Sequence, residues 1–266
     1  THLNNFFRLT TTDELQGPAA ADYLFNTLHL IRAAVISDHE TYGQSLAAAF
    51  DSRLQRLGGT VVGKLTLDAK TPDVSGFLKA VKSDGAQAVY FGGTTQDRAC
   101  EVRAQMAAIF PEGEATPFLS GDGVAQDPAC VGAAAGNSLG VYATAPFVDA
   151  TNIDGAQPVI AAFKRSFGST AAYGPYTMLA YDAAAVLYAA LDRAIRGSGG
   201  QLPVRGNVVS QLSTTTQFAG VTGTFGFDAA GDTTNRSLSL FEPTGPDPAA
   251  PWRLVTTIDY SAGLPY

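Results

Sequence analysis

The chain contains few of the residues that bind metals or carry redox chemistry. Its 266 residues include only two cysteines, Cys100 and Cys130, and three histidines, His2, His29 and His39. The cysteines do not form a CxxC pair and the histidines are scattered, whereas a structural zinc site needs four such ligands at close spacing. We therefore expect a protein without a metal site or any other cofactor.

Basic residues and long apolar runs are also scarce. Lys and Arg number 17 against 24 Asp and Glu, which gives a net charge of −7. A surface that follows a phosphate backbone needs an excess of basic residues, so nucleic acid is not an expected partner. No window approaches the roughly 18 uninterrupted apolar residues of a transmembrane helix. The hydrophobic content of 45% is nevertheless ample for a buried core.

The first half of the chain alternates short β-branched apolar runs with segments of helical spacing. Leu46, Phe50 and Leu54, for example, lie on one face of a helix. Strands separated by helices of this length imply right-handed crossovers and a parallel sheet that is covered on both faces. The sequence therefore predicts an α/β layered domain. Its strands begin near residues 31, 60, 87, 117 and 141, after an earlier strand at 5–9 and a helix that starts near Asp13.

The pattern changes after Pro146. Helices are expected at 158–167, 175–196 and 203–212 with no strand between them, and the tail returns to strands at 223–228, 237–241 and 253–259. Proline near the first turn suits the first two helices. These helices need a sheet to cover, and almost no strand accompanies them locally. They must pack on the first domain, on another chain, or on a part of the fold that is absent, and we take this as a sign of truncation.

Three loops are the candidates for a binding site. They span residues 37–43, 92–95 and 120–123, and each follows a predicted strand. In parallel sheets, ligands bind beyond the carboxyl ends of the strands, so the three loops should open on one edge. Together they offer hydroxyls, amides and carboxylates. Such a set of groups can hold a small polar or zwitterionic ligand.

Each candidate side chain in these loops also has a simpler role. Asp122 lies between two glycines and could pair with an ammonium group, although capping of the following helix is more common for a turn aspartate. The hydroxyl of Tyr42 could contact a ligand, or its ring could merely pack over the sheet edge. Thr94 and Thr95 are most simply explained as capping residues.

No catalytic constellation stands out. Ser120-Gly121-Asp122 does not supply a nucleophile elbow, and His39 has no serine or cysteine nucleophile implied nearby. The stretch 228–232 lacks the alternating oxygen ligands of a calcium loop, and a hairpin turn explains it better. We therefore expect that the chain is not an enzyme.

Short stretches along nearly the whole chain resemble the type I periplasmic binding proteins, in particular the leucine/isoleucine/valine-binding branch that serves ABC transporters. They occur in the family's order, but the resemblance begins well inside the family pattern. It implies a complete C-terminal-type lobe at 1–147, a helical remnant of the N-terminal-type lobe at 148–223 and hinge-crossing strands at 224–266. The stretches are 7–10 with 13–17, 35–43 (VISDHETYG), 89–93 (VYFGG), 118–123 (FLSGDG), 140–141, 173–176 (YGPY) with 181–183, and 223–232 (GTFGFDAAGD).

The resemblance also implies a site and a function. By position, Tyr42 matches the family's cleft tyrosine, Asp122 the acid that binds the ligand's α-amino group, and Tyr176 an aromatic residue that borders the cleft. Thr94 stands where close relatives often have tyrosine, and Asp122 is shorter than the usual glutamate, which weakens the case for branched-chain specificity. The implied function is capture of an amino acid or amide-like small molecule in an interlobe cleft, for delivery to an ABC transporter permease.

The family works outside the cytoplasm, in the periplasm or at the cell surface. An oxidising compartment favours a disulfide between Cys100 and Cys130 over two buried thiols. Two other functions stay open. One is a ligand-sensing regulatory or receptor domain, with a fused signalling domain as its partner. The other is an α/β enzyme of flavodoxin-like layout, which would bind flavin or nucleotide.

Overall fold

A computed structural model of the chain describes residues 5–67, 73–110, 116–127, 130, 140–168, 174, 176–245 and 252–264. The chain divides into two units. The smaller consists of Thr1–Thr11, Phe147–Ser237 and Asp259–Gly263, and the larger of Thr12–Pro146, Leu238–Ile258 and Leu264–Tyr266. Residues up to Thr11 thus group with the smaller unit, not with the first lobe expected at 1–147. The tail expected at 224–266 contributes to both units.

The larger unit is built on a seven-stranded sheet. Its strands are β1 (Arg32–Ser37), β2 (Thr60–Thr66), β3 (Ala88–Gly92), β4 (Phe118–Ser120), β5 (Val141–Ala145), β8 (Ser237–Pro243) and β9 (Trp252–Asp259). Their order in the sheet is β2-β1-β3-β4-β5-β8-β9. The first five pair in parallel, and β8 runs antiparallel to β5. The predicted α/β fold with a parallel sheet is therefore confirmed.

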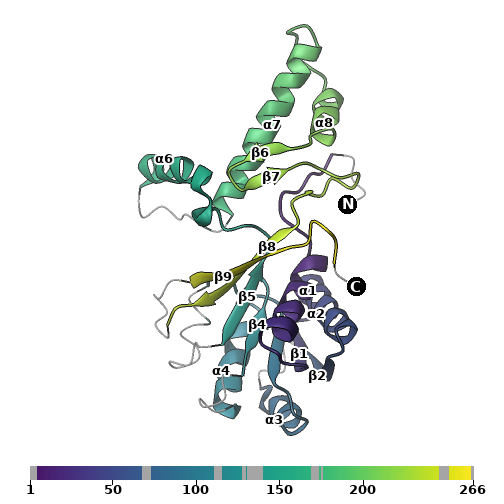
Figure 1. Ribbon diagram of the computed structural model, residues 1–266, viewed down its shortest axis with the longest axis vertical. Helices are drawn as coiled ribbons and strands as arrows, with labels where there is room; N and C mark the ends of the chain where they lie inside the picture. The colour runs from purple at the N-terminus through teal and green to yellow at the C-terminus, as the bar shows by residue number, and fades with distance from the viewer. Residues whose placement is uncertain are drawn as a thin grey trace. The chain divides into compact units, whose positions relative to one another are not determined.

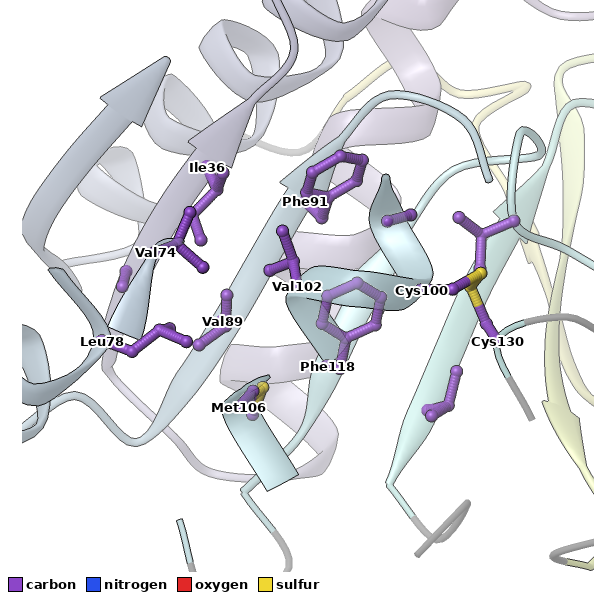
Figure 2. Packing of buried hydrophobic residues seen from close by; sticks show 14 of the residues in the cluster. Ile36, Val74, Leu78, Val89, Phe91, Cys100, Val102, Met106, Phe118 and Cys130 are labelled. Carbon is purple, nitrogen blue, oxygen red and sulfur yellow. A yellow bond between two sulfur atoms is a disulfide. The ribbon is translucent and has the colours of Figure 1, made fainter. Parts of the chain in front are cut away.

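Helices cover both faces of this sheet (Figure 1). On one face lie α1 (Asp13–Asp22), its continuation as a π-helix η1 (Tyr23–Thr27), and α2 (Thr41–Arg56); on the other lie α3 (Ser75–Ser83) and α4 (Ala99–Ile109). Leu46, Phe50 and Leu54 of α2 are fully buried, as their helical spacing predicts. Figure 2 shows the core on the other face, where Val89 and Phe118 of the sheet meet Val102 and Met106 of α4.

The structure joins Cys100 and Cys130 by a disulfide at the edge of this second core (Figure 2). Both cysteines are buried. The bond links residues 30 positions apart, so it restricts the unfolded chain.

Removal of this disulfide should destabilise the larger unit. Because a closed loop of this length lowers the entropy of the unfolded chain, the variant Cys100→Ala/Cys130→Ala should lose about 3 kcal/mol of unfolding free energy. Urea titration followed by circular dichroism, with and without a reducing agent, measures the loss. The parent should respond to the reductant and the variant should not. An unchanged urea midpoint in a parent sample with two titrated thiols would contradict this expectation.

The smaller unit is mainly helical, as predicted. It contains the 3-10 turns η2 (Ala150–Asn152) and η3 (Asp154–Ala156), the helices α6 (Gln157–Phe167), α7 (Thr177–Gly197) and α8 (Arg205–Ser213), and the strands β6 (Phe218–Gly220) and β7 (Gly223–Phe225). In the described ranges only this two-stranded sheet accompanies the three helices. Buried Asp182 of α7 holds the β6–β7 turn, since its carboxylate accepts hydrogen bonds from the backbone N–H groups of Val221 and Thr222 at 2.9 and 2.8 Å.

The strand predicted at 5–9 is wrong. Arg8 forms a single bridge with Asp232 and an ion pair with its carboxylate at 2.8 Å, and no ladder extends from it. Phe7 packs its ring on Phe227 with 5.0 Å between the centroids. Apolar side chains of the segment therefore pack locally, without a partner strand of matching length.

Helix α7 exposes several apolar side chains, namely Tyr181, Leu187 and Tyr188, the last with 72% of its surface accessible. The predicted start of this helix at Pro175 lies outside the described residues, and the helix is observed from Thr177. Over the parts of the chain that the structure describes, no helix is both long and apolar enough to cross a membrane.

Candidate functional site

The three predicted loops lie together at the carboxyl edge of the parallel strands. They follow β1, β3 and β4, which are neighbours in the sheet. The hydroxyl of Tyr42, which stands at the end of the first predicted loop and lies in the first turn of α2, is 2.7 Å from a carboxylate oxygen of Asp122 in the third loop. The backbone N–H of Thr95 in the second donates to the carbonyl of Gly123 at 3.0 Å. The edge therefore forms one connected surface, as expected from strand order.

Asp122 is half-buried, and its carboxylate is bound by side chains from two helices. Its Oδ1 accepts hydrogen bonds from the hydroxyl of Tyr42 at 2.7 Å and from Nε2 of Gln16 at 2.8 Å. Charge-assisted hydrogen bonds of this kind are stronger than neutral ones. They hold a negative charge in a fixed position at the sheet edge, which is what binding of a cation requires.

Tyr42 serves as a donor to Asp122. Burial, together with the negative charge of Asp122, raises the pKa of the Tyr42 phenol far above its usual value, so the hydroxyl keeps its proton. The hydroxyl donates a hydrogen bond to the Asp122 carboxylate, and its oxygen accepts a hydrogen bond from the backbone N–H of Gly123 at 3.2 Å. We expected this donor to face a ligand, and in the structure it is used within the protein.

Gln16 was not among the predicted site residues. It lies on α1 with 1% of its surface exposed, and Gly17 beside it allows α1 to approach α2 closely. A Cβ atom at Gly17 would lie 2.7 Å from backbone atoms of Leu46 and Phe50. The only indication of Gln16 in the sequence is that it is a polar residue within the stretch 13–17, next to this glycine and before a run of small residues.

Thr94 is held by its own loop. Its hydroxyl donates to Oδ2 of Asp97 at 2.6 Å and accepts from the backbone N–H of Asp97 at 3.2 Å. These bonds stabilise a turn, and the predicted capping of the following helix is wrong, because α4 begins only at Ala99 with Arg98 as its N-cap residue. Thr95 likewise donates to Asp127 at 2.7 Å.

Tyr176 belongs to the smaller unit. Its ring lies 5.1 Å from that of Phe147, edge to face, and 40% of the residue is exposed. The structure thus brings Tyr42, Thr94 and Asp122 to one edge and places Tyr176 in the other unit.

Asp38, which precedes the first loop's helix, is a buried acid that we had not singled out. Only 1% of its surface is exposed, and its Oδ1 accepts from the backbone N–H of Glu40 at 3.0 Å. Among the residues that the structure describes, none makes a hydrogen bond to its Oδ2. Gly93 lies so close that a Cβ there would approach Oδ2 to 2.5 Å, and its φ of +149° favours glycine. Burial raises the pKa of Asp38. The hydrogen bond from the backbone N–H of Glu40 lowers it, and the negative charge of Asp97 raises it further, so that the net shift is upward.

The raised pKa of Asp38 predicts a pH-dependent stability. The folded protein holds this proton more tightly than the unfolded chain, so stability falls as the pH rises through the raised pKa. Asp38→Asn should therefore be more stable than the parent at pH 7, with a difference that disappears below about pH 4, the ordinary range of the group. Urea unfolding at several pH values measures this.

The matched control is Asp73→Asn. Asp73 is exposed, and hydrogen bonds from Ser75 lower the pKa of its carboxyl, so the replacement should lower stability at neutral pH. If Asp38→Asn were less stable than the parent at pH 7 and this loss disappeared below about pH 4, the buried carboxylate would be stabilising and the expectation wrong.

Features of catalytic and metal sites are few. Among the described residues, no group of three or more His, Cys, Asp or Glu side chains is placed to hold a metal ion. His39 is exposed beside Glu40. The stretch 228–232 forms a turn in which Asp228 Oδ1 accepts from the backbone N–H groups of Ala230 and Asp232. A GxSxG pattern at 136–140 lies mostly outside the described residues; it leads into β5, whereas a nucleophile elbow follows a strand.

Comparison with known proteins gives one family. The family described as "Periplasmic binding protein" matches residues 2–246. A protein named "Amino acid binding protein" from Pseudomonas aeruginosa is 37% identical over 47% of this chain and 32% of its own length. A "Leu/Ile/Val-binding protein homolog 1" from Brucella abortus is 27% identical over 86% of this chain and 57% of its own length. The chain thus spans a third to somewhat over half of the length of these curated relatives.

Solved structures share the fold. A leucine binding protein LivK from Thermotoga maritima has a TM-score of 0.79 at 22% identity, covering 97% of this chain and 69% of that protein. A branched-chain amino acid transporter substrate binding protein LivJ from Streptococcus pneumoniae, in complex with isoleucine, has a TM-score of 0.73 at 20% identity, covering 96% and 67%. At these identities the likeness establishes the architecture alone.

Proposed function

Because the chain belongs to the periplasmic binding protein family, we propose that it is an extracytoplasmic solute-binding protein and not an enzyme. Its ligand is an amino acid or a similar small polar molecule, and its partner is an ABC transporter permease. The observation that carries this proposal is the carboxylate of Asp122, held by Tyr42 and Gln16 at the carboxyl edge of the sheet. A fixed carboxylate at this position suits the ammonium group of an amino acid.

The remaining site residues have distinct proposed roles. Tyr42 positions Asp122 through its hydroxyl, and its ring lines the site. Thr94 shapes the pocket, and its small side chain leaves room for a ligand larger than the branched-chain amino acids. Tyr176 borders the ligand from the second lobe. The larger and the smaller unit act as the two lobes, the segments in which the chain passes from one unit to the other act as the hinge, and the lobes close over the ligand.

The names of the relatives support the ligand class. They describe binding of amino acids, and one relative from Pseudomonas aeruginosa, 27% identical, is named for leucine, isoleucine, valine, threonine and alanine. Their names describe binding, not catalysis. Capture for transport fits both these names and the fixed carboxylate.

Thermal unfolding against a panel of ligands tests the proposal. The panel contains these five amino acids, glutamine, the larger phenylalanine and tryptophan, and the deaminated acid of each. A ligand at a thousand times its dissociation constant adds about 4 kcal/mol of stability, which raises the melting temperature by several degrees. A shift with amino acids and a smaller one with the deaminated acids supports the proposal. No shift with any amino acid, or equal shifts for both classes, would overturn it.

A further inference from the structure

Gln16 contacts Asp122 at two points. Its Nε2 donates to the Asp122 carboxylate at 2.8 Å, and its Oε1 accepts from the Asp122 backbone N–H at 3.2 Å. One side chain therefore holds both the backbone and the carboxylate of the same residue. The two residues lie 106 positions apart in the sequence, so the contact joins α1 to the loop after β4.

The amide of Gln16 is held in a single orientation. The hydroxyl of Thr144 on β5 lies 3.2 Å from Oε1 of Gln16 and 3.3 Å from the carbonyl of Ser120, to which it also donates. Gln16 and Thr144 are both buried. A flipped amide would point its NH2 group at the Asp122 backbone N–H, which can only donate, and its oxygen at the Asp122 carboxylate, which can only accept. The network excludes that arrangement.

Few side chains can replace glutamine here. The residue at position 16 needs one hydrogen-bond donor and one acceptor at the end of a side chain as long as that of glutamine. An ionised glutamate has no donor, and lysine has no acceptor. A protonated glutamate has both, because its O–H donates and its carbonyl accepts.

From this geometry we infer that Gln16 is a positioning residue for the ammonium site. It fixes the carboxylate of Asp122 at the place where a ligand's ammonium binds, without touching the ligand itself. The inference rests on the proposed function, because it assigns Asp122 to the ligand. The inference extends the proposed binding site to a residue on α1, outside the three loops.

Leucine binding by isothermal titration calorimetry between pH 5 and 7.5 tests the inference, since leucine keeps both of its charges in this range. Gln16→Leu should weaken binding about 10-fold or more at every pH, as expected for loss of a hydrogen bond to a charged group. Gln16→Glu should weaken binding at pH 7.5 and recover toward pH 5, where protonation of the introduced carboxyl restores the donor. Gln44→Glu, an exposed control on α2, should bind like the parent.

The outcomes separate the two proposals. If Asp122→Ala binds leucine as the parent does, the ammonium site of the proposed function is wrong. If Asp122→Ala weakens binding while both Gln16 variants bind normally, or if Gln16→Glu is equally weak at every pH, the positioning role is wrong.

If the parent protein does not bind leucine, the contact between Gln16 and Asp122 can still be tested by a measurement without ligand. Urea unfolding of Gln16→Leu, Asp122→Ala and the double variant gives their coupling. Residues in contact should couple by about 10-fold in the unfolding equilibrium constant. Strictly additive effects would overturn the inference.

Discussion

Replacing Arg53 by methionine should lower the unfolding free energy of the larger unit by about 3–5 kcal/mol. Arg53 of α2 is 2% exposed, and its Nε donates to a carboxylate oxygen of Asp22 at the end of α1, at 2.7 Å. Methionine fills most of the same volume but leaves the Asp22 carboxylate buried without its opposite charge. Urea unfolding by circular dichroism at pH 7 measures the loss.

Two controls identify the origin of this loss. The double variant Asp22→Leu/Arg53→Met removes both charges, so it should recover most of the stability. Lys64→Met breaks the pair between Lys64 and Asp51, in which the lysine side chain is 60% exposed, and should cost less than about 1 kcal/mol. A double variant as unstable as Arg53→Met would show that packing, not the unpaired charge, is responsible.

Asp122→Ala should weaken binding of the amino acid selected in the thermal panel by about 30-fold or more, equivalent to ~2 kcal/mol. The reason is that the ligand's ammonium would enter the site without its opposite charge. Titration calorimetry at constant ionic strength measures the affinity. Tyr42→Phe should have a smaller effect, because it removes one of two donors to the carboxylate and leaves the charge in place.

Asp127→Ala is the matched control, since it removes a negative charge from the same sheet edge. We expect a change in affinity of less than about 3-fold, in line with the screening of charges that do not contact the ligand. Equal losses for Asp122→Ala and Asp127→Ala would indicate general attraction by the acidic edge and not a specific ammonium contact.

Much of the fold followed from local patterns. The run from Ala33 to Ile36 is continuous and apolar because β1 is buried on both faces, and the spacing of Leu46, Phe50 and Leu54 marks the buried face of α2. The segment 5–9 shows the limit of such patterns. Its apolar residues suggest a strand, but pairing depends on a partner distant in the sequence, and only Arg8 forms a bridge, with Asp232.

The candidate site was predictable only in part. Tyr42, Thr94 and Asp122 follow strands of a parallel sheet, so topology alone brings them to one edge. Gln16 lies inside a helix, and its role depends on contacts with residues more than 100 positions away. Asp38 stands in a predicted loop, but its burial results from the close approach of Gly43 and Gly93, which no local pattern reports.

The division of the chain has a consequence for synthesis on the ribosome. The sheet of the larger unit is interrupted in sequence, because β5 pairs with β8 through Ala143 and Phe241, and the whole of Phe147–Ser237 is made between them. The five parallel strands can assemble while the chain is still growing, but the β5 edge stays unpaired until β8 has been made. An uncovered edge of this kind is prone to pair with other chains. A nascent chain is therefore most exposed to aggregation after β5 and before β8 has been made, and a binding factor that shields β5 would act in that interval.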